Sequence, residues 1–292
     1  MNRNMVRKAL RNPQFMILLV LAIILVLIPI LAPVIAPHDP LQEDFANFMI
    51  SGSREYPLGT DQLGRCMLSR LIWGARPSML VVFVVVAIVA TVGIVLGITA
   101  GYTGGWVDTI LSRFTDIVVA IPSTVFVIAL VSVLGPGLKN TIIAMSLVGW
   151  TEYMRVTRAL VMSIKNNTFT EEARLGGLPE GQLIHRNIVP NIMPYLLVNI
   201  TQDVGANLLT LSGLSLLGLS SQPPTPEWGF MLSEGRKFIT AAPWLIIWPG
   251  SVIVLHVVIF NLLGDSLRDI LDPRYEKQKR KWRKLKQWQA NA

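Results

Sequence analysis

Long apolar stretches that carry almost no charge are the feature that most constrains this chain. A helix that crosses a lipid bilayer needs about 20 mostly apolar residues, and six stretches of the sequence approach that length. They are residues 15–36, 78–100, 114–134, 140–162, 192–217 and 244–263. Helices satisfy all their backbone hydrogen bonds within the segment, as lipid requires. The sequence therefore predicts an all-α, polytopic membrane protein with six transmembrane helices.

The charge content agrees with this prediction. Only 15% of the residues are charged and 52% are hydrophobic, whereas about 25% of the residues of a soluble domain are charged. The net charge of +8 comes from the two ends of the chain, residues 1–14 and 272–292. A nucleic-acid-binding protein would spread its Lys and Arg over a folded face, so nucleic acid is not an expected partner, whereas membrane lipid is.

The first apolar stretch follows a basic N-terminus, as a signal peptide would. Residues 15–36 are longer than the apolar core of about 7–15 residues in a signal peptide, so we expect a retained first span. The expected organisation is a cytoplasmic N-terminus at residues 1–14, a membrane domain at residues 15–271 and a basic cytoplasmic tail at residues 272–292. Basic residues beside a last span suit anionic lipid, and a solvated tail is an equal alternative.

The distribution of Lys and Arg predicts which loops face the cytoplasm. Cytoplasmic loops carry an excess of these residues. If six spans place both termini inside, 19 of the 26 Lys and Arg lie inside and 7 lie outside. We therefore expect cytoplasmic N- and C-termini, with residues 37–77 and 220–242 as the large outer loops.

Motifs for catalysis and nucleotide binding are missing from the sequence. There is one cysteine, Cys66, and the three histidines do not form an HxxxH pattern. The sequence also lacks the GxxxxGK[ST], GxGxxG and GxSxG patterns. We expect no enzymatic activity and no cofactor bound by this chain. His256, in the sixth stretch, is a weak candidate metal ligand, since a lone histidine in an apolar span is more often a packed residue.

The fifth stretch carries a polar stripe. Asn199, Asp203 and Asn207 recur every four residues and so share one helix face. A charge inside a span usually faces the bundle interior or a watery pathway. These three residues are candidates for the lining of a translocation path that favours a cationic group. The alternative is a set of hydrogen bonds that only fixes the bundle.

Three local patterns predict packing. Gly93, Gly97 and Gly101 recur every four residues, which either allows close helix approach or reflects glycines that any span tolerates. Glu152 and Arg155 have the spacing of a local ion pair. Residues 62–73 predict an amphipathic helix that lies along the outer interface.

The inner loop at residues 166–194 predicts a short helix, a glycine turn and a second helix. Thr168 and Glu171 have the spacing of a capping box. Gly176-Gly177 suits a helix end, and Pro179 suits the start of the next helix. A polar hairpin that only joins two spans is the alternative without further knowledge.

This loop resembles the cytoplasmic EAA loop of binding-protein-dependent ABC importer permeases. The positions that match are Glu171, Glu172, Ala173, Gly177, Ile188 and Pro190. Glu172 stands where the pattern has its first alanine. Residues 56–76, 101–108, 222–229 and 261–274 resemble segments of the dipeptide, oligopeptide and nickel permeases, although Cys66 stands where that subgroup usually has Asp. The resemblance covers residues 15–274.

The resemblance implies a type I ABC importer permease fold in a bacterial or archaeal cytoplasmic membrane. It also implies a second, paralogous permease, two cytoplasmic ATPase subunits that use ATP and Mg²⁺, and an extracytoplasmic binding protein. The implied cargo is di- or oligopeptides, or nickel and metal-chelate complexes. In this family the EAA helix docks on an ATPase. The alternative function is an ATPase-independent carrier or channel for small cationic solutes.

Overall fold

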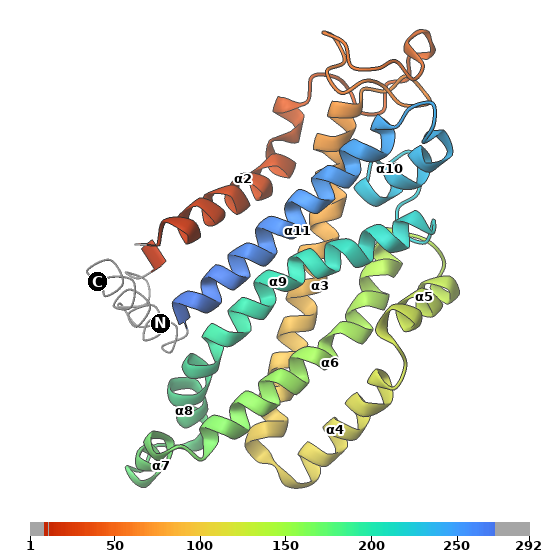
Figure 1. Ribbon diagram of the computed structural model, residues 1–292. Coiled ribbons are helices and arrows are strands. Elements are labelled where there is room, and N and C mark those ends of the chain that lie inside the picture. The colour runs from red at the N-terminus through yellow and green to blue at the C-terminus, as the bar shows by residue number, and fades with distance from the viewer. Residues whose placement is uncertain (1–8, 11, 272–292) are drawn as a thin grey trace, which may run out of the picture.

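Long helices that run side by side form the body of the protein (Figure 1). The computed structural model describes residues 9–10 and 12–271. In this part of the chain the only strand-like pairing is an isolated β-bridge between Thr60 and Cys66. The helices are α2 (Pro13–Ile35), η1 (Phe45–Asn47), α3 (Met67–Thr103), α4 (Gly105–Val119), α5 (Ser123–Leu134), α6 (Leu138–Lys165), α7 (Thr168–Leu175), α8 (Glu180–Leu183), η2 (Ile184–Ile188), α9 (Val189–Leu216), α10 (Trp228–Gly235), η3 (Arg236–Phe238) and α11 (Trp244–Leu271). The predicted all-α fold is confirmed for the described residues.

Helix α2 begins where its sequence provides a cap. The Asn12 side chain accepts hydrogen bonds from the backbone N–H groups of Gln14 and Phe15, at 3.1 and 3.4 Å. Pro13 occupies the first helical position, where its missing N–H has no helical partner to lose. The predicted first span at residues 15–36 therefore coincides with α2, apart from Ala36, which is the C-cap of the helix.

Helix α3 is longer than the predicted second span. The separate amphipathic helix expected at residues 62–73 is wrong, because α3 begins at Met67 and continues without a break to Thr103. Met67 and Leu71 are buried in the core rather than lying on an interface. These first turns pack under α10, where the Trp228 indole donates to the Leu71 carbonyl at 2.9 Å.

The predicted third span, residues 114–134, is wrong as a single helix. The chain forms α4 and α5, which meet at a bend of 79°. The break falls at residues 120–122, and Pro122 is the N-cap of α5. Proline lacks an N–H and disfavours helical geometry in the residue before it, so the ring ends one helix and starts the next.

By length and composition, three described helices can each cross a membrane: α2, α3 and α11. The bent pair α4–α5 makes a fourth if it counts as one span. Helices α6 and α9 have 28 residues each but are too polar for this criterion. The six predicted stretches all fall on helices. Two of these helices, α6 and α9, contain more polar residues than an ordinary membrane span, and both line the same cavity.

The glycine repeat of α3 forms a close contact with α6. A Cβ atom built on Gly93 would lie 2.4 Å from the Cβ of Tyr153, and one on Gly97 would lie 2.6 Å from the Cβ of Thr157. Gly101 faces Val161 in the same way, at 2.9 Å. Because small residues let two backbones approach, the repeat is a specific helix–helix interface.

Helix α10 is a short element wedged between three long helices. It contacts α3, α9 and α11, and the Trp228 side chain is only 1% exposed. A Cβ atom on Gly229 would lie 2.6 Å from the Cα of Ser212 on α9. The Glu227 side chain caps α10 by accepting from the backbone N–H groups of Gly229 and Phe230.

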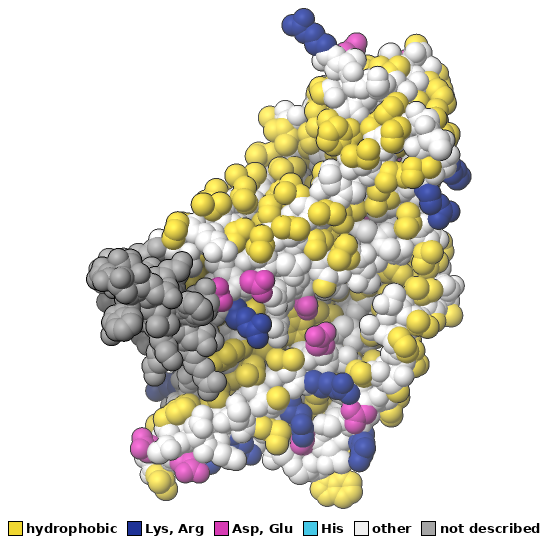
Figure 2. All heavy atoms as spheres, in the orientation of Figure 1, with side chains coloured by type: hydrophobic (Ala, Val, Ile, Leu, Met, Phe, Trp, Pro, Cys, Tyr) yellow, Lys and Arg dark blue, Asp and Glu magenta, His cyan; other side chains and the backbone are white. Residues whose placement is uncertain are grey.

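The loops divide between two ends of the molecule. Figure 1 shows the loop after α2, together with α10, at one end and α7 and α8 at the opposite end. In Figure 2, charged side chains gather over the half of the visible face that lies towards α4 and α7. Residues 1–8 and 11 of the predicted cytoplasmic N-terminus (residues 1–14) and the whole predicted tail (residues 272–292) lie outside the described residues.

Candidate translocation cavity and coupling helix

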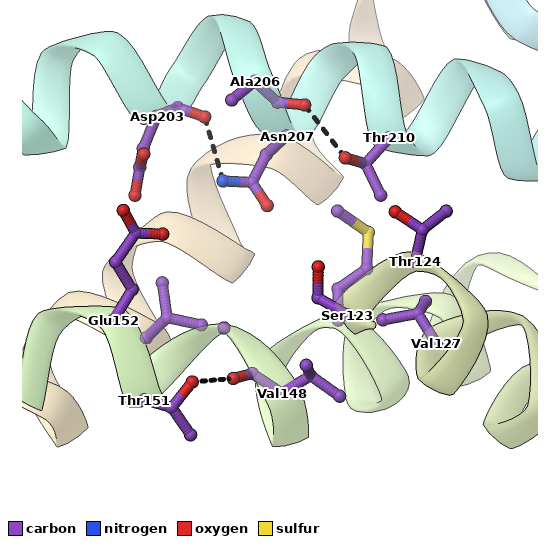
Figure 3. A pocket seen from close by; sticks show the side chains of 13 residues that line it. Ser123, Thr124, Val127, Val148, Thr151, Glu152, Asp203, Ala206, Asn207 and Thr210 are labelled. Atoms are coloured by element: carbon purple, nitrogen blue, oxygen red, sulfur yellow. Dashed lines mark hydrogen bonds between the residues drawn. The ribbon is translucent and has the colours of Figure 1, made fainter. Parts of the chain in front are cut away.

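A polar cavity of about 250 Å³ lies between α5, α6 and α9 (Figure 3). Its polar lining comes from all three helices. The polar residues are Ser123, Thr124, Thr151, Glu152, Asp203, Asn207 and Thr210. None of the residues that line it is Lys, Arg or His. The two helices that are too polar to pass as ordinary spans, α6 and α9, are therefore the two that carry the acidic side chains of this cavity.

Glu152 and Asp203 face each other across the cavity. Figure 3 shows the Glu152 carboxylate pointing from α6 towards the Asp203 carboxylate on α9. The predicted ion pair between Glu152 and Arg155 is wrong. Arg155 instead donates to Asp116 on α4 at 2.9 Å, so Glu152 stays free to face the cavity.

Only two of the three residues in the polar stripe of α9 line the cavity. Asp203 and Asn207 line the cavity, whereas Asn199 is half-buried and lies outside it. The Asn207 amide donates to the backbone carbonyl of Asp203 at 2.9 Å. Gln202, which flanks the stripe, donates to Asp265 on α11 at 2.9 Å and so binds two helices together.

Sequence reasoning did not identify five of the seven polar lining residues: Ser123, Thr124, Thr151, Glu152 and Thr210. Ser123 and Thr124 follow Pro122 at the start of α5, where they have the appearance of ordinary helix-start residues. The three-residue spacing of Glu152 and Arg155 predicts a local ion pair, whereas the cavity-facing position of Glu152 depends on helices that are distant in the sequence. A second signal was available, since Glu152 is the only acidic residue of the chain between Asp116 and Glu171.

Helix α7 is a small, exposed projection. Glu171 and Glu172 are exposed, Ala173 is half-buried, and Leu175 is 88% exposed. The helix ends as the glycine pair predicts, because Gly177 has a φ of +82° and its N–H bonds back to the Arg174 carbonyl at 3.0 Å. Such a left-handed residue is a common way to end a helix.

The predicted helix starts in this loop are off by one residue. The N-cap of α7 is Asn167 rather than Thr168, and its side chain makes no capping hydrogen bond. Pro179 is the N-cap of α8 rather than its first helical residue. Instead of a capping box, the hydroxyl of the buried Thr170 holds α7 by donating to the Ile164 carbonyl of α6 at 3.0 Å.

The last two residues of the EAA-like motif, Ile188 and Pro190, join the loop that carries α7 to the helix bundle. Ile188 is fully buried in a cluster with Val161 of α6 and Ile192 and Leu196 of α9, whereas Pro190 is exposed at the start of α9. The chain passes from α6 through α7, α8 and η2 directly into α9. Helix α7 therefore connects the two helices that carry Glu152 and Asp203.

His256 packs inside the bundle. It is 3% exposed, its Nδ1 lies 2.8 Å from the Val252 carbonyl, and its ring centroid lies 4.6 Å from that of Trp228. Within residues 9–10 and 12–271, no group of three His, Cys, Asp or Glu side chains is placed to hold a metal ion. These contacts give His256 a packing role.

Residues 93–277 match the family described as the binding-protein-dependent transport system inner membrane component. The chain belongs to this family. Residues 2–52 also match the N-terminal transmembrane domain of oligopeptide transport permease C. The protein is therefore an integral membrane permease subunit of the ABC importer class and is not itself an enzyme.

Named relatives extend over most of the chain. The dipeptide transport system permease protein DppC of Escherichia coli (strain K12) is 45% identical over 223 residues, which is 76% of this chain and 74% of the relative. The di/tripeptide transport system permease protein DppC of Pseudomonas aeruginosa (strain UCBPP-PA14) is 41% identical over 244 residues, covering 81% and 80%.

A solved structure confirms the fold class. The chain is similar to a chain of the MetNI methionine ABC transporter in an inward-facing crystal form, with a TM-score of 0.56. The match covers 70% of this chain and 97% of that chain at 17% sequence identity. At this identity the likeness concerns the fold alone.

Proposed function

We infer that this permease moves di- or tripeptides across the cytoplasmic membrane as part of an ATP-driven importer. The relatives at 41% and 45% identity carry the names of dipeptide and di/tripeptide permeases, which favours peptides over nickel or metal chelates. The importer would comprise a second, paralogous permease, two ATPase subunits that use ATP and Mg²⁺, and an extracytoplasmic binding protein.

The cavity between α5, α6 and α9 is the proposed part of the translocation path in this subunit. Asp203 and Asn207 line it, and Asn199 lies one turn before Asp203 on the same helix. Polar and charged groups inside a membrane usually face a watery path or the interior of a bundle. A cavity with this lining suits the polar backbone of a peptide better than a lipid chain.

The observation that carries the proposal is the position of α7 in the chain. The exposed Glu171 and Glu172 present α7 to a partner, while Ile188 and Pro190 continue into α9. A displacement of α7 by an ATPase would act directly on α6 and α9, which line the cavity. We propose that α7 is the ATPase-coupling helix. Gly177 ends this helix, and Ala173 lies on the face of the helix that is turned towards the protein.

The coupling role is tested by a double variant, Glu171→Lys with Gly177→Leu, in the assembled importer. Reversing the charge changes the docking surface, and a leucine at a φ of +82° is strained by about 1–2 kcal/mol. We expect peptide uptake to be abolished while insertion and assembly are retained. The matched control is Gly181→Ala, because Gly181 has no neighbour within 4 Å of an added Cβ atom.

Uptake at the wild-type rate in a properly inserted double variant would contradict the coupling role. The alternative of an ATPase-independent carrier is tested in the same proteoliposomes, by measuring dipeptide uptake with and without ATP. A carrier would move peptide down its gradient without the ATPase subunits, whereas the importer requires them.

The proposed orientation places α7 and both termini on the cytoplasmic side. The excess of Lys and Arg in those segments supports it, and so does the separation of α7 from α10 at opposite ends (Figure 1). Labelling of single cysteines at exposed positions near Glu55 and near Glu172 by an impermeant reagent in intact cells would test this. Only the position near Glu55 should react.

A further inference from the structure

Three polar side chains of the cavity lining already use a donor group within their own helices. The Thr151 hydroxyl donates to the Val148 carbonyl at 2.9 Å, and the Thr210 hydroxyl donates to the Ala206 carbonyl at 3.0 Å. The Asn207 amide nitrogen is also used, by the Asp203 carbonyl (Figure 3). Each proton is therefore held within its own helix, and the oxygen atoms of these side chains remain available to the cavity.

The two carboxylates add to these acceptors. Glu152 and Asp203 point towards each other from different helices (Figure 3), and no lining residue supplies a positive charge. An ionised carboxylate inside a membrane is costly unless a counter-charge or a hydrogen-bond donor meets it. A bound group that has both a positive charge and several hydrogen-bond donors would neutralise the two carboxylates and pair with the acceptors of the cavity.

A buried tyrosine lies beside Asp203. Tyr153 is 2% exposed and interacts with the Asp203 side chain, yet its hydroxyl makes no well-formed hydrogen bond to any residue of the described chain. Buried hydroxyl groups normally have a partner. The Tyr153 hydroxyl is therefore a group that can donate to Asp203 or to an occupant beside it.

The geometry points to a site for a primary ammonium group, held between Glu152 and Asp203 with the Asn207 side-chain oxygen as a further acceptor. A primary ammonium has a single positive charge and three N–H donors, which matches two carboxylates and an amide oxygen. This assignment rests on the proposed peptide path and adds the part of the cargo that the path recognises, the free amino terminus of the peptide.

The first test measures peptide turnover in the whole importer, reconstituted with saturating peptide-loaded binding protein. The variants are Glu152→Gln, Asp203→Asn and the double variant, all nearly isosteric. Because a hydrogen bond to a charged group contributes substantially more than a neutral one, we expect each single variant to lower turnover about tenfold. The concentration of loaded binding protein for half-maximal uptake should not change.

The matched control for these variants is Asp265→Asn. Asp265 is an exposed acid on α11 that lies outside the cavity, and an amide oxygen can still accept from Gln202. Wild-type turnover in the double variant Glu152→Gln/Asp203→Asn would overturn the ammonium site. If the wild-type importer moves no dipeptide at all, the proposed function fails instead, and the second test decides the site alone.

The second test needs no transport. A hydrophobic carbodiimide modifies protonated carboxyl groups, and mass spectrometry of the purified complex gives the rate at Glu152 and at Asp203. Propylammonium, used as the probe, should slow both rates because it keeps the carboxylates ionised and covered, while neutral propanol should not. Equal rates with and without propylammonium would overturn the site, whatever the importer carries.

A third variant separates recognition from a merely structural role. Glu152→Lys places an ammonium group of the protein opposite Asp203, so the variant should assemble with an unchanged melting temperature and lose uptake completely. If the acidic pair only fixed the bundle, the lysine would leave uptake intact. That outcome would also contradict the ammonium site.

Discussion

Arg76 donates a hydrogen bond from its Nε to the backbone carbonyl of Pro29 at 2.7 Å, linking α3 to α2. This carbonyl would normally accept from the residue four positions later, which is Pro33 and has no N–H. The arginine therefore supplies the donor that the proline removed. Its guanidinium group also lies over the Trp73 ring, 4.7 Å from the centroid.

The variant Arg76→Met should lower the stability of the complex by about 1.5–3 kcal/mol, the usual contribution of a hydrogen bond to a charged group. Methionine keeps an apolar stem beside Trp73 but removes the hydrogen-bond donor and the charge over the ring. In the background Pro33→Ala the helix regains its own N–H, so the same substitution should cost much less. Thermal unfolding of the four proteins in detergent forms a double-mutant cycle, and additive effects would show that the two residues do not share this carbonyl.

Replacing Gly97 by leucine should separate α3 from α6. A Cβ atom at this position meets the Thr157 Cβ at 2.6 Å and the Met154 carbonyl at 2.7 Å, and a backbone atom cannot move aside. Overpacking of this kind costs about 1–3 kcal/mol or more, so the yield of assembled complex should fall. Gly213→Leu is the control, because Gly213 has open space around it; an equal loss in both would refute the interface.

The variant Glu234→Gln should destabilise the end of the protein that contains α10 by about 3 kcal/mol, because it leaves a buried arginine without one of its partners. Glu234 accepts from Arg70 at 2.9 Å, and Arg70 also lies 3.2 Å from Asp61. The Arg70 side chain is only 1% exposed. Melting temperature measures the loss, with the exposed Glu55→Gln as the matched variant. Equal melting temperatures for the two would show that the ion pair contributes nothing.

The two ion pairs between α4 and α6 should differ in importance. Arg158 meets Asp108 through both Nε and Nη2, in partly buried surroundings, whereas the Arg155–Asp116 pair is about half exposed on both sides. Exposed pairs contribute about 0–1 kcal/mol, and bidentate pairs are stronger. Arg158→Gln should therefore destabilise the complex clearly more than Arg155→Gln, as judged by unfolding midpoints, and the reverse order would contradict this account.

Sequence reasoning succeeded where a residue acts on its own segment of chain. The pair Gly176-Gly177 ends α7 as predicted, because the cause lies within a few residues of the effect. It failed where the partner is distant. Arg155 was paired with Glu152 by spacing, although Asp116 lies closer to it in the fold.

The sequence by itself determined that this chain is an all-α membrane protein of the importer permease family, and where the short helix α7, proposed as the coupling helix, lies. Those conclusions depend on local apolar length and on a motif that is continuous in the chain. Only the tertiary structure decided that the glycines of α3 touch α6, and that Glu152 opposes Asp203 across one cavity. Residues 152 and 203 belong to helices that meet only after the chain has turned back through α7. The pattern of residues within either helix therefore cannot show that the two side chains are close in space.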